Sequence, residues 1–374
     1  MRSSHSPIDG PAETASGHRA LPGRRALPGE RINFGRPMLR VFGFRIDLRV
    51  VITSGLVALA ALGCGFTALL LGEFSLTPGE VFQGLFGQAD RRIVNTVVAE
   101  WRAPRVIAGI VLGAGLGVSG AVFQSLTRNP LGSPDIIGFS TGAYTGGIVT
   151  IIVFGTSFVS TAFGAIVGGI LTALIVYLLT WKGGVQGFRL IIVGIALTAM
   201  LNAFNTWLIM RADLDLAMAA ATWGAGSLNG MGWSTLLPAA IGTVILGLGC
   251  GLFSRDLGTL ELGDDTSKAL GVRNEPVRAA LILVAVALVA VVTAAAGPIA
   301  FVALAAPQIG RRIAKAQGTS LLSAAAVGAL LLVAADLIAQ HGLGETQLPV
   351  GVVTVCIGGI YLIWLLIQEA RKAQ

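Results

Sequence analysis

Long stretches without a charged residue constrain this chain more than any other feature. Seven of them occupy residues 50–72, 106–127, 136–181, 190–210, 216–254, 279–310 and 346–368, and an eighth, 316–344, contains Asp336 as its one charge. A helix needs about 20 predominantly apolar residues to cross the hydrocarbon core of a bilayer. Charged residues make up 12% of the chain, about half the fraction that is usual in soluble proteins. We therefore expect an integral membrane protein.

Three of these stretches are long enough for more than one helix. Residues 136–181 hold two helices, with a turn near Gly155-Thr156-Ser157. Residues 216–254 hold a partial helix, a glycine-rich turn and a full helix. Residues 279–310 hold one full helix and, after Gly297-Pro298, a short second one. The sequence predicts an all-α polytopic membrane protein with ten transmembrane helices.

The distribution of basic residues predicts the orientation of these helices. With ten crossings and the N-terminus inside, 21 of the 26 Lys and Arg residues fall on the cytoplasmic side. The other five, on the outer side, are Arg91, Arg92, Arg102, Arg105 and Arg211. Cytoplasmic loops of membrane proteins carry an excess of Lys and Arg. We expect a multi-pass protein of the cytoplasmic (inner) membrane with both termini in the cytoplasm, and no nucleic-acid partner despite the net charge of +7.

Residues 1–48 precede the first apolar stretch and are rich in Pro, Gly, Ser and Arg. This composition favours a disordered cytoplasmic tail, followed by a transmembrane domain over residues 49–374. Within that domain, Gly109, Gly113 and Gly117 form overlapping GxxxG pairs. Such pairs indicate close packing between helices of the chain, or a face that contacts another subunit.

Few residues suggest chemistry of their own. The cysteines and histidines show no metal-ligand spacing, no nucleophile–base pattern is visible, and no phosphate-binding GxxxxGK[ST] loop is present. We expect no catalytic residue, metal or cofactor in this chain, so ATP-driven transport would need another chain for hydrolysis.

Asp336 is interpreted as a hydrogen-bonded structural carboxylate, with a proton or ion relay as the alternative. The loop 255–278, with short amphipathic helices broken at Gly263 and Gly271, is either solvated or a docking element.

Several segments, in this order along the chain, resemble the permease subunits of type II ABC importers for ferric siderophores, haem and cobalamin. They are Glu100–Arg105, Gly113–Gln124, Arg128–Asp135, Leu262–Val272, Phe301–Pro307 and Leu348–Thr354. Four more segments are most similar to the second permease subunits of ferric-enterobactin importers. They are Phe188–Ile192, Phe204–Leu208, Gly226–Gly230 and Gly359–Glu369. The resemblance runs from about residue 50 to the C-terminus.

The resemblance implies partners and sites. The partners are a second, related permease subunit, two cytoplasmic ATPase subunits that bind ATP and Mg²⁺, an extracytoplasmic siderophore-binding protein and membrane lipid. Arg102 and Arg105 match arginines that pair with carboxylates of the binding protein, although anchoring to lipid headgroups beside Trp101 is an alternative. The segment at about 258–275 matches the coupling helices that contact the ATPases. Its implied contact residues are Glu261, Leu262, Gly263, Asp264, Asp265, Lys268, Leu270 and Gly271.

Further residues match the transport pathway of this family. Asn129 and Leu131 match an inner gate, and Gly187 with Phe188 matches a second one. The helix over 190–210 matches one that lines the central pathway. Its residues Asn202 and Asn205 are three positions apart, which predicts one shared face, although both amides could instead bond neighbouring helices.

The chain departs from the family pattern at two positions. Gln308 stands where many members have His, and Gln340 falls near a third docking arginine of some relatives. The predicted function is that of a permease subunit of an ATP-driven importer for iron–siderophore complexes. Alternatives are a haem or cobalamin permease of the same family, and a proton-coupled carrier that depends on Asp336.

Overall fold

The computed structural model describes residues 32–33, 37–41, 44–72, 74–181, 187–316, 318–342 and 347–372. The chain divides into two compact units, Met1–Asp47 and Leu48–Gln374. In the first unit, three short strands form an antiparallel sheet in the order β1 (Ile32–Asn33), β2 (Pro37–Val41) and β3 (Phe44–Asp47). The part of the expected tail before residue 32 lies outside the described residues.

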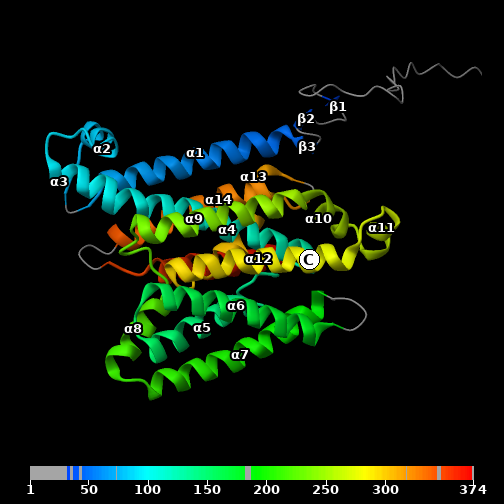
Figure 1. Cartoon of the computed structure of the whole chain (residues 1–374). Coiled ribbons are helices and arrows are strands. Elements are labelled where there is room, and N and C mark those ends of the chain that lie inside the picture. Colours follow the sequence, from blue (N-terminus) through cyan, green and yellow to red (C-terminus); the bar gives the residue numbers. More distant parts are fainter. Residues whose placement is uncertain are drawn as a thin grey trace, which may run out of the picture. The chain divides into compact units, whose positions relative to one another are not determined.

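The second unit is built of helices (Figure 1). Its long helices are α1 (Leu48–Leu70), α4 (Ala103–Thr127), α6 (Phe158–Thr180), α7 (Gly187–Arg211), α9 (Trp233–Leu252), α12 (Asn274–Ala296), α14 (Leu321–His341) and α15 (Val350–Lys372). The shorter ones are α2 (Pro78–Leu85), α3 (Arg92–Asn95), α5 (Phe139–Phe154), α8 (Leu214–Gly224), α10 (Ser254–Glu261), α11 (Asp264–Ala269) and α13 (Val302–Ala314). A π-helical segment, η1 (Thr96–Arg102), joins α3 to α4.

Seven helices in the described part of the chain are long and apolar enough to cross a membrane. They are α1, α4 with the turns before it, α6, α7, α9, α12 and α14. The apolar helices α5 and α15, together with α13, complete the ten crossings that the sequence predicted. The chain is therefore a multi-pass membrane protein.

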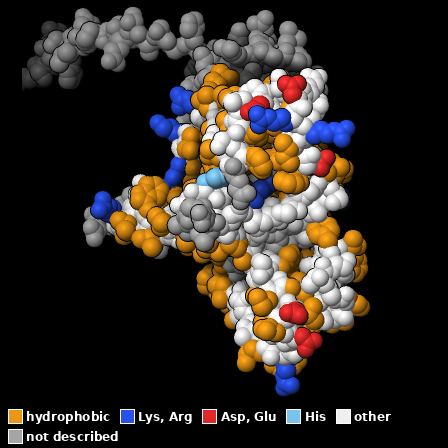
Figure 2. Space-filling view, turned by 90° about the vertical axis from the view of Figure 1, so that its left-hand side faces the viewer, with side chains coloured by type: hydrophobic (Ala, Val, Ile, Leu, Met, Phe, Trp, Pro, Cys, Tyr) orange, Lys and Arg blue, Asp and Glu red, His pale blue; other side chains and the backbone are white. Residues whose placement is uncertain are grey.

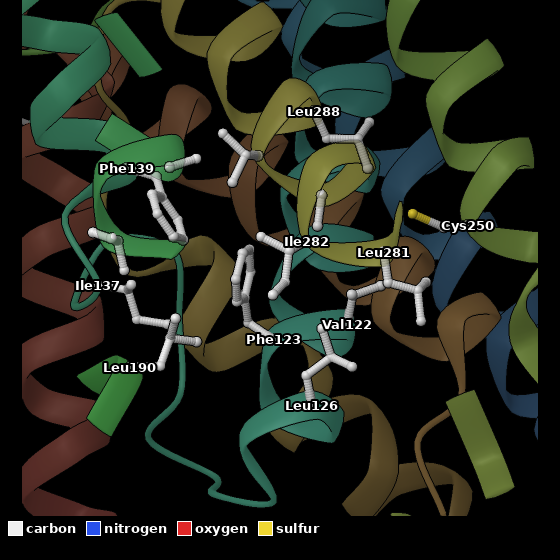
Figure 3. Packing of buried hydrophobic residues seen from close by; sticks show 14 of the residues in the cluster. Val122, Phe123, Leu126, Ile137, Phe139, Leu190, Cys250, Leu281, Ile282 and Leu288 are labelled. Atoms are coloured by element: carbon white, nitrogen blue, oxygen red, sulfur yellow. The ribbon is translucent and has the colours of Figure 1, made fainter. Parts of the chain in front are cut away.

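Helices α4 and α12 form the centre of the bundle. The apolar window of the α4 span is 78% buried and that of α12 is 61% buried, whereas the window of α1 is 22% buried. Figure 1 shows α5, α6, α7 and α8 on one side of this pair and α1, α9, α13 and α14 on the other. In the core, the rings of Phe123 and Phe139 lie 5.2 Å apart beside Leu190 and Ile282 (Figure 3). Because lipid tails are as apolar as these side chains, such contacts stabilise the bundle through close packing.

The predicted glycine spacing marks a helix contact inside the chain. A Cβ atom added to Gly113 of α4 would lie 2.5 Å from the carbonyl oxygen of Gly328 on α14. One added to Gly117 would lie 2.1 Å from the carbonyl oxygen of Ala324, one turn along the same helix. No side chain fits at either position, so the two backbones pack directly against each other.

Two of the crossing helices are too short to span the bilayer core. At 1.5 Å per residue, the 16 residues of α5 and the 13 residues of α13 extend about 24 Å and 20 Å, against a core of about 30 Å. Both follow non-helical segments, residues 128–138 and 297–301. Irregular backbone at this depth must find its hydrogen bonds within the protein. One such bond runs from Gly132 N to Asn129 O at 2.9 Å.

Candidate functional site

The predicted coupling segment folds as two short helices separated by a glycine. Helix α10 ends at Glu261 and α11 begins at Asp264, and Gly263 between them has a φ of +113°. Side chains other than glycine rarely adopt this conformation. Leu262 and Leu270 are 64% and 61% exposed, although both are large apolar residues. The segment therefore presents two leucines at the end of the bundle opposite α2 and α3 (Figure 1).

Asp264 fixes this projection to the bundle. Its carboxylate pairs with Arg128, at the end of α4, and with Arg278 of α12, whose Nη2 lies 3.0 Å away. Partial burial raises the pKa of the Asp264 carboxyl, but the guanidinium groups of Arg278 and Arg128 outweigh that effect and hold its pKa below the ordinary value. The carboxylate thus joins the start of α11 to two membrane helices.

The other predicted coupling residues divide into anchoring and outward-facing ones. Glu261 accepts hydrogen bonds from Ser125 Oγ at 2.8 Å and from the backbone N–H of Thr319 at 3.3 Å. Asp265 and Lys268 are exposed. Gly271, exposed as well, has a φ of +85° and ends the turn after α11. Two acidic residues hold the segment in place, and the exposed residues remain available to a partner.

The two predicted docking arginines form bonds inside the chain. Arg105 makes a two-bond ion pair with Asp336, with Nε–Oδ2 and Nη2–Oδ1 distances of 2.8 Å. Arg102 donates to the carbonyl oxygen of Leu69, near the end of α1, at 2.7 Å and to that of Phe74, in the loop after α1, at 3.0 Å. Arg105 is therefore neutralised by a carboxylate, whereas the hydrogen bonds of Arg102 go to uncharged groups.

Asp336 has the environment of a structural carboxylate. Its side chain is 5% exposed and also accepts a hydrogen bond from Gln340 Nε2 at 2.6 Å. Gln340 takes part in this network at the position near which some relatives have a third docking arginine. The positive charge of Arg105 and the hydrogen bond from Gln340 compensate the buried charge of this carboxylate.

The predicted inner gate is a tight turn after α4. Asn129 Oδ1 accepts the backbone N–H of Leu131 at 2.9 Å, an arrangement that favours a turn over a continuing helix. Gln308 of α13 donates to the carbonyl oxygen of Pro130 at 2.6 Å. Gln308 also accepts a hydrogen bond from Tyr361 of α15 at 3.4 Å. The residue that departs from the family pattern thus bonds this turn to α13 and α15.

The residues predicted on α7 do not share one environment. Gly187 is the first residue of α7, and Phe188 is 76% exposed. Asn202 is exposed, whereas Asn205 is 3% exposed and its amide has no hydrogen-bond partner among the described residues. Three residues advance a helix by 300°, so the two side chains point about 60° apart and lie toward the same side of α7, although one is exposed and the other is buried.

Sequence reasoning missed three residues that connect segments in the structure. Arg128 and Arg278 bind Asp264 from different helices. Asp135, before α5, accepts hydrogen bonds from Ser140 Oγ at 2.5 Å and from the backbone N–H of Phe301 at 3.2 Å. Asp135 occurs within a segment that the sequence marked, but its distant partner is visible only in the fold.

The bundle of membrane helices in the described part of the chain defines a polytopic membrane protein. The chain belongs to the FecCD transport family, which matches residues 59–368. It is 51% identical over 327 residues to the ferric enterobactin transport system permease protein FepG of Escherichia coli (strain K12), which covers 87% of this chain and 99% of that protein.

Two further comparisons agree with this assignment. The chain is 36% identical over 312 residues to the iron(3+)-hydroxamate import system permease protein FhuG of Bacillus subtilis (strain 168), which covers 81% of this chain and 93% of that one. The fold also matches a solved structure described as an inward-facing conformation of a metal-chelate type ABC transporter, with a TM-score of 0.75 and 28% sequence identity. The match covers 85% of this chain and 99% of the chain in that structure.

Proposed function

We propose that this chain is a permease subunit of an ATP-driven importer that moves iron–siderophore complexes across the cytoplasmic membrane, with ferric enterobactin as its cargo. The observation that carries the proposal is the 51% identity to FepG, which extends over 99% of that protein. The identity to the hydroxamate permease FhuG is 36%. This difference favours a catecholate siderophore over a hydroxamate one.

ATP would be hydrolysed on two partner ATPase subunits, which bind ATP and Mg²⁺ and contact the segment α10–α11. Its exposed leucines, Leu262 and Leu270, support this role, because large apolar side chains at the aqueous end of a membrane protein favour a protein partner. The bonds of Glu261 and Asp264 support it as well, since an anchored projection passes its movement to the helices that hold it.

On the outer side, a substrate-binding protein would deliver the loaded siderophore. Arg102 is the better candidate for pairing with a carboxylate of that protein, because its hydrogen bonds go to carbonyl groups and no carboxylate of the described residues forms an ion pair with it. Arg105 would support docking indirectly, by fixing the start of α4 through Asp336. Figure 2 views the side of the molecule on which α2 and α8 lie, and it shows charged side chains among hydrophobic ones.

The cargo would pass between this chain and a second, related permease subunit. Large side chains on α7, among them Phe188 and Trp207, are exposed on the isolated chain and would face lipid or that subunit. Asn129 and Leu131 would gate the cytoplasmic end and Asn202 would line the pathway, whereas the buried Asn205 would position α7. A proton-coupled carrier is disfavoured, because Asp336 is engaged by Arg105 and Gln340.

Uptake of radioactive iron by cells that lack this chain tests the proposal. Ferric enterobactin and a ferric hydroxamate are supplied in parallel, with the empty vector and a restored copy as controls. We expect loss of ferric enterobactin uptake in the deletion strain and its recovery with the restored copy. Loss of hydroxamate uptake instead would change the cargo, and unchanged uptake of both would direct the test to haem and cobalamin.

A further inference from the structure

One carboxylate bonds the starts of the two short membrane helices. Asp135 accepts a hydrogen bond at 2.5 Å from the hydroxyl of Ser140, in the first turn of α5. Its other oxygen accepts one at 3.2 Å from the backbone N–H of Phe301, directly before α13. The two bonded residues are far apart in sequence, so the contact joins separate parts of the bundle. Asp135 also lines a cavity of about 240 Å³ with Ser140, Thr141 and Tyr144.

The surroundings of Asp135 favour a link between helices over a cation site. Both of its hydrogen-bond donors are uncharged, and no basic side chain of the described residues forms an ion pair with it. The N-termini of α5 and α13 lie beside it and carry the positive ends of the helix dipoles. These ends stabilise the carboxylate and disfavour a cation in the cavity.

Phe301 is held in an uncommon backbone conformation at this link. Its φ of 69° and ψ of −24° fall in the left-handed region, which a bulky aromatic residue rarely adopts. Its ring lies against Gly358 of α15, where an added Cβ atom would be 2.3 Å from it. Strained residues persist only where their surroundings hold them, and they cluster at sites that move. Asp135 is one of the groups that hold Phe301.

A single helix connects this link to the coupling segment. Helix α12 begins at Asn274, which accepts a hydrogen bond from Ser267 of α11 at 2.9 Å. One turn later, Arg278 donates to Asp264 at 3.0 Å. The same helix ends at Ala296, and the next residues lead to Phe301. One continuous and largely buried helix therefore lies between the contacts of α11 and the segment that leads to Phe301.

We propose that Asp135 is a positioning residue of the transport cycle, which passes movement of α12 and the start of α13 to α5 through its bonds to Phe301 and Ser140. The inference rests on the proposed function, since it requires an ATP-driven movement of α11. Loss of the link would leave ATP hydrolysis in place and separate it from transport.

The test uses the complete importer in proteoliposomes, with the loaded siderophore-binding protein and ferric enterobactin. Asp135→Asn keeps the size of the side chain but loses one of its two acceptor oxygens. We expect ATP hydrolysis within about twofold of the wild type and iron uptake reduced about tenfold, the size of a typical coupling effect. Ser140→Ala should give a smaller loss of iron uptake, and Ser140→Thr, which keeps the hydroxyl group, should retain the uptake of the wild type. The exposed carboxylate variant Asp215→Asn is the matched control.

Three outcomes separate the inference from the proposed function. An unchanged ratio of ATP hydrolysed to iron transported in Asp135→Asn would overturn the inference. A parallel fall of hydrolysis, uptake and thermal stability would also overturn it, because a purely structural role predicts that result. Failure of the wild-type complex to take up ferric enterobactin would instead overturn the proposed cargo.

A second measurement addresses the link without any cargo. Spin labels are placed on Thr145→Cys in α5 and Ile313→Cys in α13, with the native cysteines replaced. In the wild-type background we expect one distance between the labels with and without ATP, because the two helices move together. Asp135→Asn should give two distances, and a single distance in both backgrounds would contradict the proposal.

Discussion

Asp336 and Arg105 form an ion pair inside the helix bundle, with the two side chains 5% and 14% exposed. Removing charged groups from water is costly, and the mutual attraction offsets that cost only when the geometry is good. Here two bonds of 2.8 Å and the amide of Gln340 provide such geometry. The pair fixes the C-terminal part of α14 to the start of α4, so its main contribution is to position these helices.

Replacing one member of this pair should destabilise the protein. In Asp336→Asn the guanidinium group of Arg105 remains buried without a counter-charge, which costs about 3–5 kcal/mol. Thermal unfolding in detergent measures the loss, with the exposed Asp215→Asn as the control. If Asp336→Asn kept its stability but lost transport, the proton-relay interpretation of this carboxylate would regain support.

Asp264 gives a prediction for the effect of pH. Its folded-state pKa lies below the ordinary value of 3.8, so the ion pairs with Arg128 and Arg278 add stability above that value. This contribution is lost as the pH falls through the folded-state pKa. We expect the difference in Tm between the wild type and Asp264→Asn to stay constant from neutral pH to about pH 5. Below 3.8 it should shrink.

The neighbouring Asp265 serves as the control for this experiment. It is exposed, and the structure shows no ion pair for it among the described residues. Asp265→Asn should leave Tm close to the wild-type value throughout the range. A difference for Asp264→Asn that widened on acidification would show that the ion pairs do not stabilise the fold.

Among the helices, the contact of α4 with α14 depends on the absence of side chains. Gly113 and Gly328 lie so close that an added Cβ atom would meet backbone, which cannot move aside without shifting a helix. Gly247 of α9 offers a matched position, since no atom of the described residues lies within 4 Å of a Cβ atom added there.

Alanine at these two glycines should therefore have different effects. We expect Gly113→Ala to destabilise the protein by about 1–3 kcal/mol, the usual cost of overpacking, and Gly247→Ala to have little effect. Thermal unfolding of the purified chain in detergent compares the two. Equal stability of both variants would contradict the close packing of α4 and α14.

The segment α10–α11 combines an anchored side with an exposed one, and the two sides should respond differently to substitution. Leu262→Ser with Leu270→Ser changes only exposed side chains, so the stability of the chain should remain unchanged. When this chain is purified, the amount of partner ATPase subunit that is recovered with it should fall about tenfold or more. A loss of this size is usual when residues that dominate the binding energy of an interface are removed. Leu59→Ser on α1, exposed to 65%, is the control, and undiminished recovery would exclude this surface as the contact.

For the whole molecule, the charge distribution and the fold together give a proposed orientation. Arg91 and Lys268 are both exposed, and α3 and α11 lie at opposite ends of the bundle (Figure 1). The positive-inside rule places α11, with most of the basic residues, in the cytoplasm.

Labelling with a membrane-impermeant thiol reagent tests this orientation. In a chain whose three native cysteines are replaced, Arg91→Cys should react in spheroplasts and Lys268→Cys only after the membrane is opened. The cysteine-free parent is the control for background labelling. The reverse pattern would invert the orientation and exclude α10–α11 as the contact for cytoplasmic ATPases.

The membrane helices and the place of the short helices α10 and α11 could be predicted from the sequence. The bilayer core contains no water to form hydrogen bonds with free backbone N–H and C=O groups, so an uncharged stretch that crosses it must form a helix. The length of the stretch then indicates how many crossings it holds. The turn at Gly263 could be predicted as well, because glycine between two short amphipathic stretches favours a break. Both inferences depend on residues that are close together along the chain.

The partners of the charged residues could not be predicted in this way. Arg105 matches a docking residue by its motif, yet in the structure it pairs with Asp336, and Asp135 bonds the start of α13. These contacts join residues that are distant in sequence, and they depend on which helices pack side by side. The fit of small residues and polar groups between helices determines which helices pack together in a membrane. Neither hydropathy nor local spacing in the sequence predicts that fit.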